Sequence, residues 1–113
     1  EAIINTCIHH PWSTFRFTVN GYYQMFRGIQ YIQNPAHIQQ IPKNLPLFFV
    51  AGGDDPVGNN GKSVTQVCQQ YKAAGIQDVQ IKLYPGDRHE ILNETDRDVV
   101  YADLLTWLNG HLA

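Results

Sequence analysis

Two turns hold the residues whose chemistry stands out. The first follows the apolar run 47-LFFVA-51 and carries Asp54 and Asp55, and the second follows the alternating segment 79-VQIKLY-84 and carries His89. In an open parallel sheet, sites form beyond the carboxyl ends of the strands, so both turns are expected at one edge. A carboxylate beside an imidazole fixes the histidine tautomer and stabilises the imidazolium, as in a nucleophilic triad. The pattern therefore favours an acid and a base of nucleophilic catalysis.

A phosphate-binding loop is the alternative interpretation of the first turn, because Gly61-Lys62-Ser63 follows it. Such a loop needs a glycine five residues before the Gly-Lys-Ser, with free backbone N–H groups around the phosphates. That position holds Pro56, which has no N–H, and the two aspartates would repel a polyanion. Lys62 and Ser63 are better explained as the polar first turn of a helix.

Other function classes find little support in composition. The 113 residues carry a formal charge of −2, which gives no basic face for nucleic acid. No apolar run is long enough for a membrane span, and no segment is typical of a signal peptide. Cys7 and Cys68 give no disulfide framework, so a reducing, cytoplasmic location is expected. A metal at Cys7, His9 and His10 is not expected either, because adjacent histidines rarely converge on one ion.

The elements that must position the two turns can be read from hydrophobic periodicity. A helix is predicted after Asn20 and ends before Pro35, and a short helical piece is predicted around Ala36–Gln40; residues 1–13 are predicted to be irregular. The strand Leu47–Ala51 should be buried on both faces. It leads to a helix over Lys62–Ala74 and then to the alternating strand Val79–Tyr84. A last helix is predicted from the start signal formed by Thr95 and Asp98. The apolar face of this helix holds Val99, Val100, Leu104, Trp107 and Leu108.

This order of elements predicts two parallel strands joined by a helical crossover. Two such strands cannot bury both faces alone. The sheet is therefore expected to continue, either through another segment of a longer protein or through association with another copy of the chain. Composition changes near 42-PKNLP-46, because nine of the ten acidic residues lie from Asp54 onward.

The segments 45-LPLFFVAGGDDPVG-58, 71-YKAAGIQDVQIKLYPGDRHEILNE-94 and 99-VVYADLLTWL-108 resemble the C-terminal part of α/β-hydrolases. The closest resemblance is to the monoacylglycerol lipase and lysophospholipase-like branch, also called serine aminopeptidase-like. It is strong from Ile41 to Leu112 and weaker from Phe15 to Gln40, and no resemblance is found before Thr14. The resemblance implies an α/β fold in which residues 1–44 form a cap-like helical segment and residues 45–113 the β-α-β-α end of the hydrolase core.

The resemblance also implies roles for individual residues. The family's Gly-x-x-Asp turn matches Gly52 to Asp55, which makes Asp55 the triad acid and leaves Asp54 to solvate the turn. The family's Tyr-x-Gly-x-x-His-Glu turn assigns the triad base to His89, with Glu90 and Glu94 as structural residues of the turn. The cap of the family lines an acyl pocket, which implies substrate contacts for three aromatic residues, Tyr22, Phe26 and Tyr31.

The sequence departs from the family at the nucleophile. It contains no Gly-x-Ser-x-Gly, and its only serines are Ser13 and Ser63. We therefore expect two thirds of a triad: a part of a serine hydrolase that cleaves carboxylic esters of lipid-like substrates without a cofactor, and that is inactive as this chain alone. Two alternatives stay open, a non-catalytic piece that acts only by association and a hydrolase of amide, thioester or carbon–carbon bonds.

Overall fold

The computed structural model describes residues 2–13 and 15–112 of the chain, without the side chains of residues 2 and 3. It divides into two compact units, Glu1–Ile38 and Gln39–Ala113, and each is described by itself. The sequence-based assignment of residues 1–44 to a cap and 45–113 to the core stays a prediction. None of the described helices is both long enough and apolar enough to cross a bilayer.

The first unit is helical. It contains α1 (Ala2–His9), α2 (Val19–Gln33) and α3 (Pro35–Ile38). Thr18 caps α2, because its Oγ1 accepts a hydrogen bond from the Gly21 N–H at 3.0 Å. As expected, α2 ends immediately before Asn34 and Pro35.

The prediction of an irregular N-terminal segment was wrong, since residues 2–9 form α1. Ile4, Cys7 and Ile8 do recur at spacings of three and four, which is the helical period. The helix is only eight residues long, so its helical period is repeated too few times to be a strong signal.

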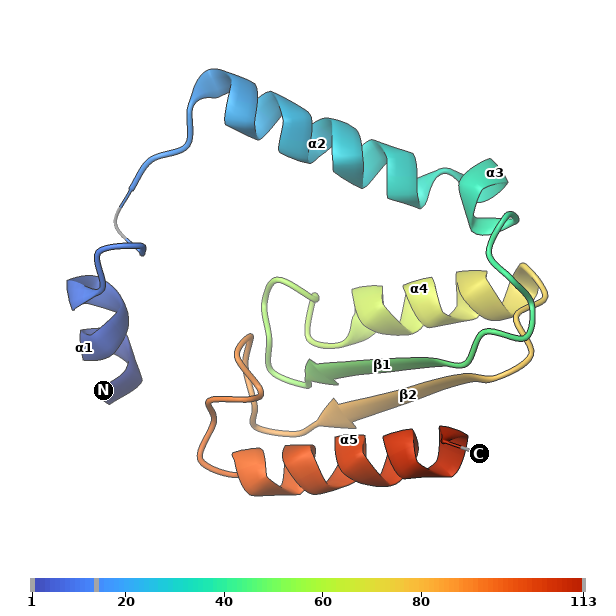
Figure 1. Cartoon of the computed structure of the whole chain (residues 1–113). Helices are drawn as coiled ribbons and strands as arrows, with labels where there is room; N and C mark the ends of the chain where they lie inside the picture. The colour runs from blue at the N-terminus through green and yellow to red at the C-terminus, as the bar shows by residue number, and fades with distance from the viewer. Residues whose placement is uncertain (1, 14, 113) are drawn as a thin grey trace. The chain divides into compact units, whose positions relative to one another are not determined.

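The second unit contains β1 (Leu47–Gly52), α4 (Lys62–Ala73), β2 (Val79–Tyr84) and α5 (Arg97–His111). The two strands pair in parallel, from Leu47 opposite Val79 to Gly52 opposite Tyr84. Figure 1 shows α4 and α5 on opposite faces of this two-stranded sheet. The predicted α/β class, with parallel strands alternating with helices, is confirmed.

Each face of the sheet has its own small core. On the α4 side, Cys68, Ile76 and Val79 are buried, and the partly buried Leu47, Phe49, Ile41, Tyr71 and Ile81 pack on them. On the α5 side, Tyr84, Ile91 and Val100 are buried, with Val50 and Leu104 against them. Side chains alternate between the two faces of β1, so one strand contributes to both cores.

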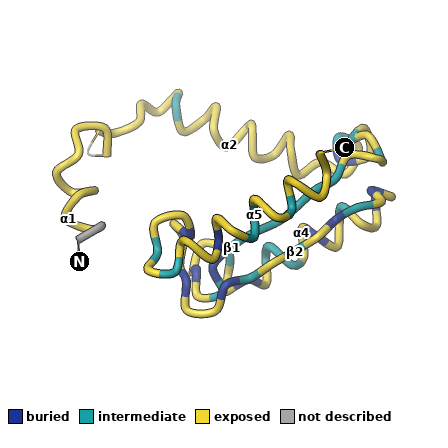
Figure 2. Tube along the Cα trace, turned by 60° about the horizontal axis from the view of Figure 1, so that its bottom comes forward, coloured by how far each residue is buried: buried dark blue, intermediate teal, exposed yellow. Residues whose placement is uncertain are grey.

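The prediction that β1 is buried on both faces was wrong for this chain. Residues 47–51 are only half-buried, and Gly52 alone is buried (Figure 2). The reason is that, within the described residues, β1 pairs with β2 along one edge only. Its sequence is that of an internal strand, but its second neighbour is missing from the described sheet.

Helix α5 also departs from its prediction. It begins at Arg97, and its N-cap residue is Asp96, not Thr95. Of the residues expected on its apolar face, Val100 is fully buried, whereas Val99 and Leu108 are about half exposed. Among the described residues the sheet has two strands, and this is too narrow to cover the whole apolar stripe.

Candidate active site

The carboxylate of Asp55 is held firmly at the carboxyl end of β1. Its side chain is only 8% exposed. Oδ1 accepts a hydrogen bond from the Val57 N–H at 2.9 Å, and the Asp55 carbonyl accepts one from the Asn60 N–H at 2.9 Å. Asn59, Asn60 and Gly61 then adopt left-handed conformations that lead the chain into α4. The turn therefore fixes the position of one carboxylate.

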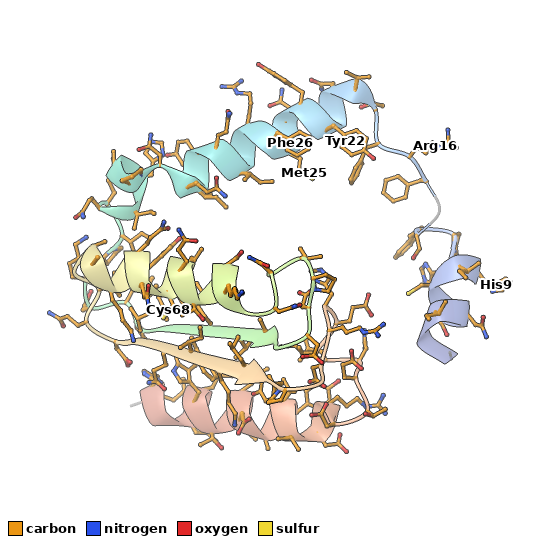
Figure 3. The ribbon with its side chains drawn as sticks, turned by 180° about the vertical axis from the view of Figure 1, so that it is seen from behind. His9, Arg16, Tyr22, Met25, Phe26 and Cys68 are labelled. Carbon is orange, nitrogen blue, oxygen red and sulfur yellow. The ribbon has the colours of Figure 1, made fainter. Side chains whose placement is uncertain are left out.

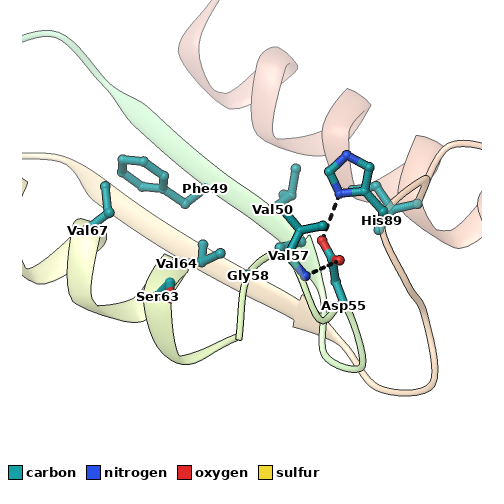
Figure 4. A pocket seen from close by; sticks show the side chains of 11 residues that line it. Phe49, Val50, Asp55, Val57, Gly58, Ser63, Val64, Val67 and His89 are labelled. Carbon is teal, nitrogen blue, oxygen red and sulfur yellow. Dashed lines mark hydrogen bonds and ion pairs between the residues drawn. The ribbon is translucent and has the colours of Figure 1, made fainter. Parts of the chain in front are cut away.

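His89 completes a dyad with this carboxylate. Its Nδ1 lies 2.9 Å from Asp55 Oδ2, across 34 residues of sequence (Figure 4). The imidazole side chain is 68% exposed, and in the described part of the chain Nε2 has no hydrogen-bond partner. An acid at the end of β1 and a base after β2 thus meet where the parallel strands end.

The electrostatics keep Asp55 ionised. The hydrogen bond from His89 lowers the pKa of the Asp55 carboxyl below its usual value, and the Val57 N–H acts in the same direction, whereas burial opposes both. An ionised carboxylate can only accept hydrogen bonds, so Nδ1 carries the proton. In neutral His89 the lone pair is therefore on the exposed Nε2, as a general base requires.

Direct contact between the backbones of the two turns brings the dyad together. The Gly53 N–H donates to the Tyr84 carbonyl at 2.7 Å, and the Asp54 N–H donates to the Asp87 carbonyl at 2.9 Å. A Cβ at Gly52 would overlap the carbonyl oxygens of Asp87 and Arg88. Gly52 is thus a positioning residue that sequence reasoning missed; the paired glycines at the strand end were the available signal.

Hydrogen bonds from side chains hold the second turn, which carries His89, in place. Glu94 Oε1 accepts a hydrogen bond from the Arg88 N–H at 3.1 Å, and Glu90 Oε2 accepts one from Asn93 Nδ2 at 2.9 Å. From α5, the Tyr101 hydroxyl donates to the Leu92 carbonyl at 2.7 Å. The structural role expected for Glu90 and Glu94 is consistent with these bonds. Asp54 contributes its backbone N–H to the contact of the two turns, and its side chain is exposed.

An apolar cavity of about 430 Å³ adjoins the dyad (Figure 4). Its wall includes Phe49, Val64 and Val67, with Asp55 and His89 at one end. Ser63 also lines it, but its hydroxyl is not hydrogen-bonded to His89. Among residues 2–13 and 15–112, no group of three His, Cys, Asp or Glu side chains is arranged to hold a metal ion.

The three aromatic residues expected to contact substrate lie on α2, in the first unit, and are described within that unit alone. Tyr22, Met25 and Phe26 lie on one side of the helix, as their spacing requires (Figure 3). Tyr22 packs edge-on against Phe17, and Tyr31 stacks on His37 with ring centroids 3.7 Å apart. All three predicted residues are exposed, and their contact with substrate stays a prediction.

Comparison with known proteins decides the family. The model of the family described as Serine aminopeptidase, S33, matches residues 1–96. The chain belongs to this family. The resemblance to the α/β-hydrolases is thereby confirmed, and it extends into residues 1–13, where the sequence pattern had shown none. The match stops one residue before α5 begins.

Two lipases are similar in sequence to much of the chain. It is 34% identical to the monoglyceride lipase of Saccharomyces cerevisiae over 92 residues, which are 77% of this chain and 28% of that protein. It is also 34% identical to the monoacylglycerol lipase of Mycolicibacterium smegmatis over 70 residues, 59% of this chain and 22% of that protein.

A solved structure gives the same result for the fold. The crystal structure of a highly thermostable carboxyl esterase from Bacillus coagulans in complex with glycerol matches with a TM-score of 0.87 at 29% identity. The match covers 96% of this chain and 36% of the esterase. The chain thus spans between 22% and 36% of the length of these three proteins.

Proposed function

We propose that this chain supplies the acid and the base of a serine hydrolase that cleaves carboxylic esters of lipid-like substrates. The observation that carries the proposal is the hydrogen bond between His89 Nδ1 and Asp55 Oδ2, with Nε2 left open at the strand ends. The names of the two relatives, both lipases of monoacylglycerols, support an ester substrate with an acyl chain.

The chemistry follows from this geometry. A serine hydroxyl supplied from outside the two turns gives its proton to His89 Nε2 as its oxygen attacks the ester carbonyl. Asp55 stabilises the imidazolium that forms, and its own carboxyl stays ionised. His89 then returns the proton to the leaving alcohol, and a water molecule activated by the same nitrogen hydrolyses the acyl-enzyme. The sequence holds no Gly-x-Ser-x-Gly, so the chain alone is expected to be inactive.

A second proposal concerns association, and the observation that favours it is the edge of β1 that is unpaired among the described residues. The strand is half-buried although its sequence is that of an internal strand, and the 430 Å³ cavity adjoins it. An exposed apolar strand edge pairs readily with another strand. We therefore propose that this edge pairs with the serine-bearing part of a hydrolase or, in its absence, with a second copy of the chain.

A chimera tests the catalytic proposal. The chain replaces the matching 36% of the Bacillus coagulans esterase, which then supplies the remaining part of the hydrolase. The chimera should react with a fluorophosphonate probe and hydrolyse monoacylglycerols, whereas the 113-residue chain alone should do neither. Asp55→Asn should lower turnover by about 10⁴-fold, and His89→Ala by a similar factor.

The matched control is Asp54→Asn, which removes the same charge one residue away and should leave turnover nearly unchanged. A folded chimera that keeps normal turnover after the Asp55 or His89 substitution would contradict the assignment. Activity on amide or thioester substrates only would favour the alternative reaction classes. Sedimentation of the chain alone distinguishes a monomer from a self-associated chain.

A further inference from the structure

A second pair of acidic side chains, Asp87 and Asp96, lies near the turn that carries His89 and does not include Asp55. Asp87 comes two residues before His89 and is only 5% exposed, and Asp96 is the N-cap residue of α5. Asp87 Oδ2 and Asp96 Oδ1 are both buried, and neither accepts a hydrogen bond from a donor group among the described residues. A buried carboxylate oxygen without a donor is costly, so the pair needs an explanation.

The side chain of Asp96 does not perform the usual task of its position. An N-cap aspartate normally accepts a hydrogen bond from an N–H in the first turn of its helix. Asp96 makes no such bond. Its carboxyl instead lies close enough to that of Asp87 to help raise the pKa of Asp87. The cap residue of α5 is thus directed at the turn that carries His89.

Two ionised carboxylates can only accept, so their contact becomes a hydrogen bond when one of them holds a proton. The surroundings favour that proton. Burial is the main cause that raises the pKa of Asp87, followed by the hydrogen bond and charge of Asp96 and by the charges of Glu94 and Asp54. Burial and then Asp103 raise the pKa of the nearby Tyr84, and the charges of Asp87 and Asp96 add smaller contributions in the same direction. In the part of the chain that is described, no Lys, Arg or His forms an ion pair with either aspartate.

We propose that Asp87 and Asp96 share one proton, and that the resulting carboxyl–carboxylate hydrogen bond is a positioning element that fastens the histidine turn to the start of α5. One shared proton satisfies both buried oxygens at once. The positioning role rests on the proposed function of His89, whereas the shared proton does not.

The backbone transmits the effect to the dyad. The Asp87 carbonyl accepts the Asp54 N–H, next to Asp55, and the following Arg88 N–H is held by Glu94. Loss of the shared proton leaves two buried charges of the same sign, which repel each other. The turn then moves away from α5, and the hydrogen bond between His89 and Asp55 lengthens.

The sign of the pH effect follows from the protons bound. The pKa of Asp87 is higher in the folded state than its unfolded value of 3.8. The stability that this carboxyl contributes is fully present below pH 3.8 and is lost as the pH rises through the folded-state pKa. The wild-type chain should therefore lose unfolding free energy as the pH rises through the folded-state pKa of Asp87, whereas the Asp87→Asn variant should not lose it in this pH range. The amide of asparagine donates a hydrogen bond to Asp96 at every pH.

The experiment is an NMR titration of the 113-residue chain, read from the side-chain carboxyl ¹³C signals and the ring signals of His89. One carboxyl of the pair should titrate above 3.8, and the His89 signals should shift in the same pH window, separately from titration of the ring itself. Asp87→Asn and Asp96→Asn should each abolish both changes. Asp98→Asn is the matched control, with the same charge change in the first turn of α5, and should preserve both.

Each outcome decides the proposal. If both wild-type carboxyls titrate at or below 3.8, the shared proton is wrong, even if a variant fails to fold. If one carboxyl titrates high while the His89 signals stay still through its window, the positioning role is wrong. Neither readout uses turnover, so an inactive chimera would contradict the proposed function without affecting the shared proton.

Discussion

The two units of the chain use apolar residues differently. The first unit has many large apolar side chains, including Tyr22, Phe26 and Tyr31, yet among its described residues only Ile38 is buried. The second unit buries a cluster on each face of its sheet and holds the dyad at the strand ends. A pair of strands offers two faces to two helices, whereas the apolar stripe of α2 has no comparable partner within its own unit.

This contrast separates two kinds of apolar pattern. In the second unit, apolar spacing identifies the residues that form the two cores, because strand and helix faces meet in a defined register. In the first unit, the same apolar spacing marks a helix face that is exposed. An exposed apolar surface of this kind is typical of a binding site or of an interface with another part of a protein. The proposed acyl contacts of α2 use that surface.

The sharpest test of the contrast substitutes glycine by alanine in each unit. Gly52→Ala places a methyl group against the carbonyls of Asp87 and Arg88, and backbone cannot give way cheaply, so we expect a loss of about 3 kcal/mol in the free energy of unfolding. The Asp55–His89 hydrogen bond should be lost with it. Urea denaturation and the His89 NMR signals measure the two effects.

Gly28→Ala is the matched control in α2, where a Cβ would meet nothing within 4 Å. It should stabilise the helix by about 0.5–1 kcal/mol, because alanine has the higher helix propensity. If Gly52→Ala were as harmless as Gly28→Ala, the close contact of the two turns would not hold the dyad together.

The second test compares truncations of apolar side chains. Val100 is fully buried against Tyr84 and Ile91, so Val100→Ala should cost about 2 kcal/mol of unfolding free energy. Phe26 is 57% exposed, and Phe26→Ala should change the same quantity by less than about 0.5 kcal/mol. A larger cost at Phe26 than at Val100 would show that α2 packs on a core of its own.

The third test asks whether the exposed stripe of α2 serves the substrate. In the chimera, Phe26→Ala should raise KM for a long-chain monoacylglycerol by about tenfold and leave kcat unchanged, because only uniform binding is removed. KM for a short-chain ester should hardly change. Equal effects on both substrates would contradict an acyl contact at Phe26.

The smallest expected effect concerns the pH dependence of the second unit. His111 Nε2 lies 2.7 Å from Asp78 Oδ2, which links the end of α5 to the start of β2. The backbone carbonyl of Trp107, and then Asp78, raise the pKa of His111, while His111 and then Gln80 lower the pKa of Asp78. The stabilising charge pair is therefore complete between the two altered pKa values.

On the alkaline side, the contribution of His111 is fully present below pH 6.5 and is lost as pH rises through its folded pKa. On the acid side, the contribution of Asp78 is present above 3.8 and is lost as pH falls through its folded pKa. Denaturation of His111→Gln across this range should show a flatter curve than the wild type. An unchanged curve would mean that the exposed pair does not contribute to stability.

Much of the fold could be predicted because its signals are local. The alternation of Val79–Tyr84, the stop of α2 before Pro35 and the stop of α4 at Gly75 each depend on a few neighbouring residues. The burial of β1 and the start of α5 could not be predicted in the same way. The first depends on how many strands lie beside β1, and the second on a cap residue, Asp96, whose side chain makes no capping hydrogen bond.

The sequence by itself determined that a carboxylate and an imidazole follow two parallel strands, and its resemblance to the family's Gly-x-x-Asp turn predicted Asp55 rather than Asp54 as the acid. Only the tertiary structure decided that Asp55 and His89 meet at 2.9 Å, because that distance depends on the pairing register of β1 with β2. It also depends on the absence of a side chain at Gly52, which lets the two backbones touch. Residue types can be read from a linear pattern, but distances between turns 34 residues apart are set by how the backbones pack.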